Sequence, residues 1–157
     1  MPTSNRNIKH VTNINAPIEV VWKALVDIDA WEWNKWTRLE AKEASEGTRG
    51  KLRASYEGDG EWETFDFTFG EVDSVAHILN WKGSVGPFGC LFTGNHVMRL
   101  ENIVDDDGSG LTRLIHTETF GGLLPALGMG LPYKILDRNY LLMNESLKKF
   151  VEVKSGL

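Results

Sequence analysis

Residues 91–101, LFTGNHVMRLE, and residues 111–120, LTRLIHTETF, are the two segments that decide the fold. In each segment apolar and polar side chains alternate with a period of two, which is typical of a strand with one covered face. The segment between them contains DDDG at residues 105–108, a composition typical of a turn. The two segments therefore predict an antiparallel hairpin.

The register of this hairpin follows from charge. In an antiparallel hairpin the numbers of the two residues in each pair add to a constant total. This total must be even for the two strands to share an inward face, and we expect it near 214. A total of 214 pairs Glu101 with Arg113, whereas a total of 212 would pair Arg99 with Arg113. Because opposite charges stabilise a cross-strand pair and like charges destabilise it, we predict the register with a total of 214.

Three polar side chains then share the inward face. His96 is expected opposite Glu118, and His116 opposite Met98, so that His96, His116 and Glu118 form one cluster. Such a cluster could supply general acid–base catalysis, or it could be a buried hydrogen-bond network that also anchors a ligand's carbonyl or hydroxyl group. Two histidines and a carboxylate also match a metal triad in type. We predict no metal site, and the sequence leaves the first two interpretations open.

Period-two alternation continues upstream. Glycine- and aspartate-rich turns divide the segment from Leu39 to Phe120 into six runs, which predicts six antiparallel strands. The alternation assigns these upstream side chains to the covered face: Phe65, Phe67, Phe69, Leu79 and Trp81. Thr64, Asp66, Asn80 and Lys82 are expected on the opposite, solvated face.

The N-terminal part adds a seventh strand and two short helices. Residues 8–14, IKHVTNI, predict a strand because they alternate and are rich in β-branched residues. Pro17 suits the first position of a helix and Glu19 its positive end, which predicts a helix over 17–26. Residues 29–36, DAWEWNKW, are expected to form a brief helix or turn.

The C-terminal part predicts the longest helix. It begins near Pro132 and runs for about 20 residues, with Lys154 favouring its C-terminal end. Its apolar residues at helical spacing are Leu136, Tyr140, Met143, Leu147 and Phe150. A sheet with one apolar face must be covered, so we predict an α+β fold in which this helix covers a seven-stranded antiparallel sheet.

The length and composition limit the number of domains, the partners and the cellular location that we expect. The chain has 157 residues, close to the roughly 150 of one average domain, so we expect a single domain over 1–157. The net charge of −5, without a basic cluster, argues against nucleic-acid partners. Cys90 is the sole cysteine, residues 1–10 lack a signal-peptide core, and no apolar stretch is long enough to span a bilayer. We therefore expect a soluble, cytoplasmic protein.

Aromatic residues are unusually frequent, with six tryptophans and seven phenylalanines. They could form an aromatic-rich core, an aromatic-lined cavity, or both. Trp31, Trp33 and Trp36 could form the lip of such a cavity or pack against the rim of the sheet. Glycines bracket the apolar segment 123–127, which could be a movable gate or a plain loop that seats the helix.

Five segments together resemble a known superfamily. They are residues 14–25 (INAPIEVVWKAL), 33–36 (WNKW), 79–83 with 91–96 (LNWKG and LFTGNH), 112–123 (TRLIHTETFGGL) and 143–149 (MNESLKK). In this order they resemble the START-related SRPBCC superfamily, in its polyketide cyclase/dehydrase and lipid transport branch. Lys35 stands where the family's Trp-Asn-Pro segment has proline. The resemblance covers nearly the whole chain.

The resemblance implies a helix-grip fold, in which a strongly curved sheet holds the C-terminal helix over a hydrophobic cavity. We expect the protein to bind a small hydrophobic or aromatic, polyketide-like or lipid-like molecule there. One alternative is a cyclase or dehydratase-type enzyme, and another is a protein-interaction or co-chaperone module with a collapsed cavity. No catalytic signature of the family transfers residue by residue, so whether the chain is an enzyme stays open.

The candidate site residues follow from the inward faces and from the expected cavity. The catalytic candidates are His96, His116 and Glu118, and no cofactor is predicted. The candidate ligand-binding residues are Trp33, Phe65, Phe67, Leu79, Trp81, Phe92, His96, Met98, His116, Glu118, Phe120, Leu124, Leu127, Leu131 and Ile135. The sequence does not indicate an oligomeric state.

Overall fold

A computed structural model describes residues 7–108, 110–126 and 132–156 of the chain. Its strands form one antiparallel sheet in the order β1-β7-β6-β5-β4-β3-β2. The strands are β1 (Ile8–Ile14), β2 (Thr37–Glu40), β3 (Arg49–Ala54), β4 (Glu63–Asp73), β5 (Ile78–Val85), β6 (Phe92–Val104) and β7 (Gly110–Gly121). All seven were predicted from alternation and turn residues.

Two helices match the predicted ones. Helix α1 (Ile18–Val26) follows Pro17, and helix α3 (Tyr133–Lys154) follows Pro132. Each proline occupies the cap position rather than the first helical turn. Of the expected helix or turn over 29–36, only the 3₁₀ turn η1 (Ile28–Ala30) is helical.

Two further short elements were not predicted. The 3₁₀ turn η2 (Pro87–Gly89) precedes β6, and the single-turn helix α2 (Leu123–Ala126) follows β7. The amides of Leu123 and Leu124 donate to the carbonyls of Cys90 and Leu91, so this turn is attached to the start of β6. Leu127, the last residue of the expected gate segment, and the glycines that follow it lie outside the described ranges.

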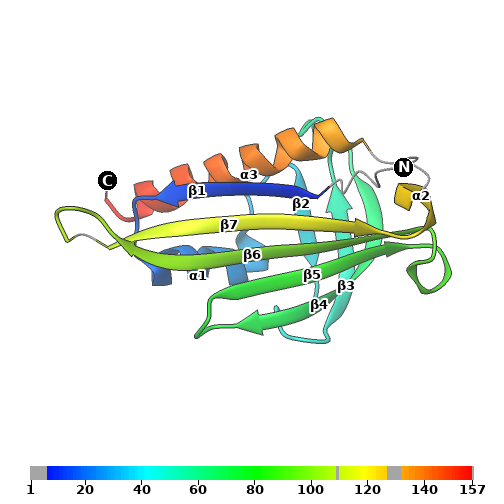
Figure 1. Cartoon of the computed structure of the whole chain (residues 1–157), viewed down its shortest axis with the longest axis horizontal. Helices are drawn as coiled ribbons and strands as arrows, with labels where there is room; N and C mark the ends of the chain where they lie inside the picture. Colours follow the sequence, from blue (N-terminus) through cyan, green and yellow to red (C-terminus); the bar gives the residue numbers. More distant parts are fainter. Residues whose placement is uncertain (1–6, 109, 127–131, 157) are drawn as a thin grey trace.

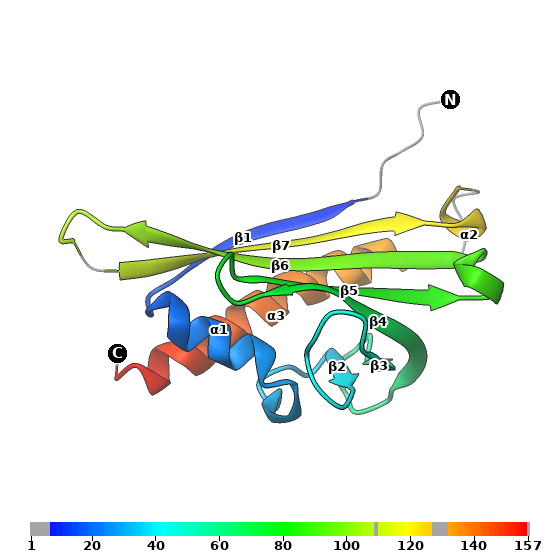
Figure 2. The ribbon, with the colours of Figure 1, turned by 90° about the horizontal axis from the view of Figure 1, so that it is seen from below.

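The sheet curves around α3 (Figures 1 and 2). A bulge between Phe69 and Val72 interrupts the pairing of β4 with β5, and bulges bend the strand that carries them. Figure 2 shows α1 and α3 on the same side of the sheet, with β2 and β3 curling toward them. This is the predicted helix-grip arrangement of an α+β chain.

Helix α3 lies between the two edges of the curved sheet. On the β1 side, the His10 ring contacts the carbonyl of Asp137 at 2.9 Å, and the Asn15 amide donates to Glu152 at 2.8 Å. On the opposite side, Asn139 Nδ2 donates to the carbonyl of Tyr56 at 2.9 Å. These contacts fix the position of the helix over the concave face.

The predicted strand phase and register are both confirmed. Leu79, Trp81, Phe67 and Phe69 are buried on the concave face. Asp66, on the other face, is exposed.

In the hairpin, His96 pairs with Glu118, Met98 with His116 and Glu101 with Arg113, each with the total of 214. Arg113 Nη1 lies 3.6 Å from Glu101 Oε2, in agreement with the charge argument.

Helix α3, although the longest in the described ranges, is too polar to cross a membrane. No helix in this part of the chain combines the length and the apolar character that a membrane span requires.

Candidate functional site

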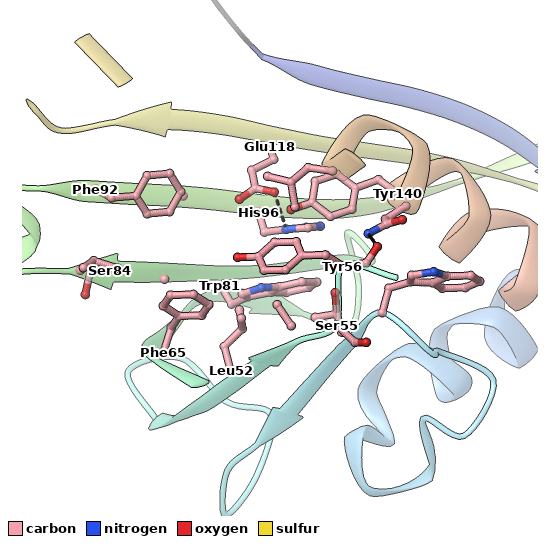
Figure 3. A pocket seen from close by; sticks show the side chains of 18 residues that line it. Leu52, Ser55, Tyr56, Phe65, Trp81, Ser84, Phe92, His96, Glu118 and Tyr140 are labelled. Atoms are coloured by element: carbon pink, nitrogen blue, oxygen red, sulfur yellow. Dashed lines mark hydrogen bonds and ion pairs between the residues drawn. The ribbon is translucent and has the colours of Figure 1, made fainter. Parts of the chain in front are cut away.

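A pocket opens between the concave face of the sheet and the N-terminal half of α3 (Figure 3). Its cavity volume is about 90 Å³, and the empty space between its walls, mouth included, is about 700 Å³. The aromatic residues that line it are Trp36, Tyr56, Phe65, Trp81, Phe92 and Tyr140. They come from five strands or loops and from α3, so the pocket exists only in the folded chain.

A buried acid–base pair lies in the wall of this pocket. Glu118 Oε2 is 3.1 Å from His96 Nδ1, and the two side chains are 8% and 4% exposed. In Figure 3 the pair lies between Phe92 on one side and Tyr140 on the other. The neighbouring Gly94 leaves room for the acid, because a Cβ there would lie 2.4 Å from Glu118 Oε1.

His116 lies behind this pair and does not line the pocket. Its Nε2 contacts Nε2 of His96, and its Nδ1 lies 2.7 Å from Oδ1 of Asn144. Complete burial, followed by the proximity of His96, lowers the pKa of His116 well below its ordinary value. His116 is therefore a neutral imidazole at pH 7.

Tyr140, which lies on α3, contacts the Glu118–His96 pair. Its ring packs against His96 and His116, with centroid distances of 4.7 and 5.0 Å. Burial, the nearby Glu118 and a hydrogen bond to Glu118 raise the pKa of Tyr140 well above its usual range. Tyr140 therefore stays a neutral phenol that can donate a hydrogen bond.

Trp81 forms the opposite wall of the site. Its indole stacks on the His96 ring at 4.1 Å with an interplanar angle of 12°. Within the described residues, its Nε1 has no hydrogen-bond partner, and Glu118 Oε2 has no aligned donor. Buried polar atoms without partners are costly, and a ligand group could satisfy them.

Tyr56 stands at the other side of the pocket. Burial, followed by the carboxylate of Glu63, raises the pKa of Tyr56 to about 12. Its hydroxyl donates to Glu63 Oε2 at 3.1 Å, and its carbonyl accepts from Asn139. The phenol is thus tied to β4 while its backbone is tied to α3.

The pocket brings together five of the candidate ligand-binding residues, namely Phe65, Trp81, Phe92, His96 and Glu118. The other described candidates lie outside its lining. Trp33, Phe67, Leu79, Met98 and His116 are buried in the packed interior, while Phe120, Leu124 and Ile135 are partly buried. Leu127 and Leu131 lie outside the described residues.

Helix phase explains why Ile135 does not face the pocket. Leu136, Asn139 and Tyr140 line it with spacings of three and four residues, so they share one face of α3. Ile135 precedes that face by one residue, a rotation of about 100°. Of the three tryptophans expected at the lip, Trp36 lines the pocket, whereas Trp31 and Trp33 belong to the core.

Several lining residues were not among the candidates. Leu52, Ala54 and Tyr56 follow a period of two, so alternation could have placed them on the inward side. Asn139 is an amide on the otherwise apolar face of the predicted helix, and such an amide indicates buried hydrogen bonding. Asn144 on the same helix is buried behind the pocket wall, where it contacts His116. No group of three or more His, Cys, Asp or Glu side chains in the described ranges is arranged to hold a metal ion.

Comparison with known proteins supports the fold. The sequence matches no family model and no curated protein. Among solved structures, the Zhui aromatase/cyclase from Streptomyces sp. R1128 has a TM-score of 0.68 at 18% identity, with 93% of each chain covered. A hypothetical protein, jhp0584 from Helicobacter pylori, has a TM-score of 0.69 at 14% identity, covering 94% of this chain and 88% of that one.

A third structure, Ara h 8.0201, has a TM-score of 0.60 at 15% identity, covering 94% of this chain and 97% of that one. At these identities the likeness establishes a shared helix-grip fold.

Proposed function

We propose that the protein binds a small, uncharged aromatic or other apolar molecule in the pocket beneath α3. The observation that carries this proposal is the combination of aromatic walls with the buried pair Glu118 and His96. Apolar walls with a few fixed polar groups are the usual composition of a small-molecule site. A ligand hydroxyl or carbonyl would meet the polar pair, while its apolar part lies against Phe65, Trp81 and Phe92.

The charges in the pocket specify the ligand further. The described lining residues include one carboxylic acid, Glu118, and neither lysine nor arginine. A ligand carboxylate would therefore find no cation to pair with. Neutral phenols, ketones and amines fit this environment better than fatty acids, which narrows the lipid-like class expected from the sequence.

The size of the pocket limits how much of a ligand it can enclose. A cavity volume of about 90 Å³ is below the roughly 300–1,000 Å³ of typical ligand sites. A flat ring could enter between Trp81 and Phe65, while the rest of the ligand would occupy the mouth near Tyr56. A protein-interaction module would not need this aromatic opening, so we place that alternative last.

A pair of glycine substitutions tests the proposal. A Cβ at Gly83 would have its closest neighbours at 3.9 Å, and Gly83 lines the pocket, so the side chain of Gly83→Val starts in open space and takes up part of the pocket. Gly110→Val is the matched control, since that strand glycine has equal space and lies outside the pocket lining. The probe is 1-aminoanthracene, an uncharged aromatic amine whose emission increases in apolar surroundings.

We expect the wild type and Gly110→Val to bind this probe, and Gly83→Val to bind it at least about tenfold more weakly. Thermal unfolding of both variants verifies that they are folded. Equal binding by all three proteins would reject the pocket as the ligand site.

Acid–base catalysis of a cyclase or dehydratase type is the second candidate function. The observation in its favour is that Glu118, His96 and Tyr140, all groups capable of holding a transferable proton, meet at one wall. In a binding protein, Glu118→Gln should reduce affinity by at most about 1 to 2 kcal/mol. In an enzyme, the same change should reduce turnover by about 10²- to 10⁴-fold with little change in affinity.

Three broader proposals accompany this function. The shared fold and the five matching segments support membership in the SRPBCC superfamily, in the branch named above. The chain length supports a single ligand-binding domain over 1–157, and the sole cysteine supports a cytoplasmic location.

A further inference from the structure

Two glycines lie opposite each other in the wall of the pocket, Gly83 on β5 and Gly94 on β6. On the same face of the two strands, the pairs before and after them both carry side chains, and these pairs are Trp81 with His96 and Val85 with Phe92. All six residues line the pocket. The glycine pair is therefore a gap in a row of side chains that faces the pocket.

The backbone does not require glycine at either position. Neither residue has a positive φ, and the strand pairing on both sides of them is regular. Glycine inside a strand weakens the strand, and it often marks a place where a ligand or another chain segment approaches the backbone closely. The reason for the two glycines therefore lies in the space above them.

That space is filled above one glycine and open above the other. A Cβ at Gly94 would collide with Glu118 Oε1, just as a Cβ at Gly50 on β3 would collide with the carbonyl oxygen of Glu40. At Gly83 the nearest atoms would be 3.9 Å away, so no group of the described residues takes the place of the missing side chain. We call this position over Gly83 the vacant place, and the Glu118 carboxyl lies beside it.

The vacant place has the width of one side chain. Residues two apart on a strand are separated by about 7 Å, so Trp81 and Val85 leave room between them for one flat ring. Leu52 on β3 limits the place on one side, since its Cδ1 lies 3.9 Å from the Cβ position at Gly83. Glu118 on β7 limits it on the other side. The place therefore admits a flat ring more readily than a thick one.

The walls around this place are aromatic. Figure 3 shows Phe65 and Phe92 on one side of the pocket and Trp81 with His96 on the other. The rings of Trp81 and His96 are stacked at 4.1 Å and are nearly parallel, so the row already contains flat rings packed face to face. Stacked and edge-to-face contacts stabilise aromatic pairs beyond the burial of their surface. An aromatic ligand ring would gain this stabilisation, and a saturated ring would not.

Buried polar groups at the same place give a second, independent indication of a ligand. Trp81 is completely buried, and its Nε1 has no acceptor within the described residues. The side chain of Glu118 is 8% exposed, and its Oε2 has no aligned donor there. A carboxyl group has about four acceptor sites when ionised and still accepts when protonated, so the hydrogen bond from Tyr140 leaves acceptor capacity in either state.

We propose that the vacant place over Gly83 receives one flat aromatic ring of the ligand, and that a hydroxyl or N–H group on the edge of this ring donates a hydrogen bond to Glu118. The ring stands where the row between Trp81 and Val85 lacks a side chain. This inference rests on the proposed function, and it narrows the ligand from apolar molecules in general to phenols and aryl amines. Saturated rings and aromatic rings without a donor bind less tightly.

Nuclear Overhauser effects between protein and ligand test the location of the ring in the wild type. With 2-naphthol bound, the Gly83 Hα that points to the concave face should show contacts to the naphthol ring protons. Gly110, at the start of β7 and outside the pocket lining, should show none. Bound 2-naphthol without a contact to Gly83 would overturn the proposal, and this result requires no variant to fold.

A comparison of three compounds tests the ligand class. We expect 2-naphthol to bind at least about tenfold more tightly than its saturated analogue, decahydro-2-naphthol. It should also bind about 3- to 10-fold more tightly than naphthalene, which lacks the donor. Calorimetry measures the Kd values. Equal values for 2-naphthol and decahydro-2-naphthol would overturn the selection for a flat ring, and equal values for 2-naphthol and naphthalene would overturn the hydrogen bond to Glu118.

Gly83→Ala places a methyl group in the vacant place. It should weaken the binding of 2-naphthol at least about tenfold and that of decahydro-2-naphthol by less than about threefold. Gly110→Ala is the matched control, because its Cβ would also have 3.9 Å to the nearest atom and lies outside the pocket lining, so it should leave both Kd values unchanged. Unchanged binding of 2-naphthol by Gly83→Ala would overturn the proposal.

The same measurements separate this inference from the proposed function. If 1-aminoanthracene and all three naphthalene compounds fail to bind the wild type, both are overturned. If 1-aminoanthracene binds and is displaced by the three compounds with equal affinity, the pocket is the ligand site and only the role of the vacant place is overturned.

Discussion

The concave face of the sheet has two halves with the same pattern of inward side chains and different contents. One half lies under α1 and the C-terminal part of α3, where Trp22, Leu25, Leu100, Leu114 and Leu147 are buried in one core cluster. The other half lies under the N-terminal part of α3 alone and contains the pocket. The half that lies under two helices is close-packed, whereas the half that lies under one helix contains the pocket.

The buried polar groups of the two halves also differ in their hydrogen bonding. Thr112 is buried in the packed half, where its hydroxyl donates to the carbonyl of Ala16 at 2.7 Å. In the pocket half, Glu118 and Trp81 keep polar atoms without partners among the described residues. Unpartnered polar atoms also occur in the packed core, as at Trp33 Nε1, so the pocket half differs in that a ligand can approach the atoms left without partners there.

Phe69→Ala provides the largest expected effect, because Phe69 is 1% exposed and packs against Phe67 at 5.0 Å in the packed half. Truncation of a fully buried phenylalanine leaves a cavity and should reduce the free energy of unfolding by about 3 to 5 kcal/mol. Urea denaturation measures this loss. A change below about 1 kcal/mol would mean that this half is not close-packed.

The second largest effect that we expect is a loss of stability at acidic pH, caused by His116. The pKa of His116 is lowered on folding, so the unfolded chain takes up a proton near the ordinary value of 6.5 and the folded chain does not. Stability from this group is therefore fully present above pH 6.5 and should fall by about 2 kcal/mol on acidification to pH 5. Denaturation at pH 7 and pH 5 should show this loss in the wild type and a smaller one in His116→Gln. Equal losses would exclude His116 as the cause.

Phe65→Ala is the matched partner of Phe69→Ala, since both residues lie on the concave side of β4. Phe65 is half-buried and lines the pocket, so its removal enlarges space that already exists. We expect a loss of stability below about 1.5 kcal/mol, together with weaker binding of 1-aminoanthracene. Equal stability losses for the two phenylalanines would remove the distinction between the two halves.

Asp66→Asn should have the smallest effect. Asp66 lies between Phe65 and Phe67 on the convex face and forms an exposed ion pair with Lys51. Exposed ion pairs contribute little, so the free energy of unfolding should change by less than about 0.5 kcal/mol. Urea denaturation of this variant gives the reference against which the stability losses of the two phenylalanine variants are compared. A loss of unfolding free energy as large as that of Phe69→Ala would contradict the predicted strand phase.

The sequence by itself determined the strands, their inward faces and the hairpin register. Alternation is a property of single strands, and the charges of Glu101 and Arg113 select between two registers without reference to any distant residue. For the same reason, the juxtaposition of His96, His116 and Glu118 was predictable. These features depend on short-range geometry that the order of residues specifies directly.

Only the tertiary structure decided which inward residues line a cavity and which are core. Phe65 and Phe69 have the same periodicity, and they differ in what surrounds them, since Phe69 is buried in the core cluster and Phe65 lines the pocket. Tyr140 and Asn144 reach the histidine pair because α3 lies at one rotation and depth between the two edges of the sheet, a position set by contacts far apart in the chain. Periodicity specifies the direction of a side chain, whereas the space it meets depends on packing across the whole fold.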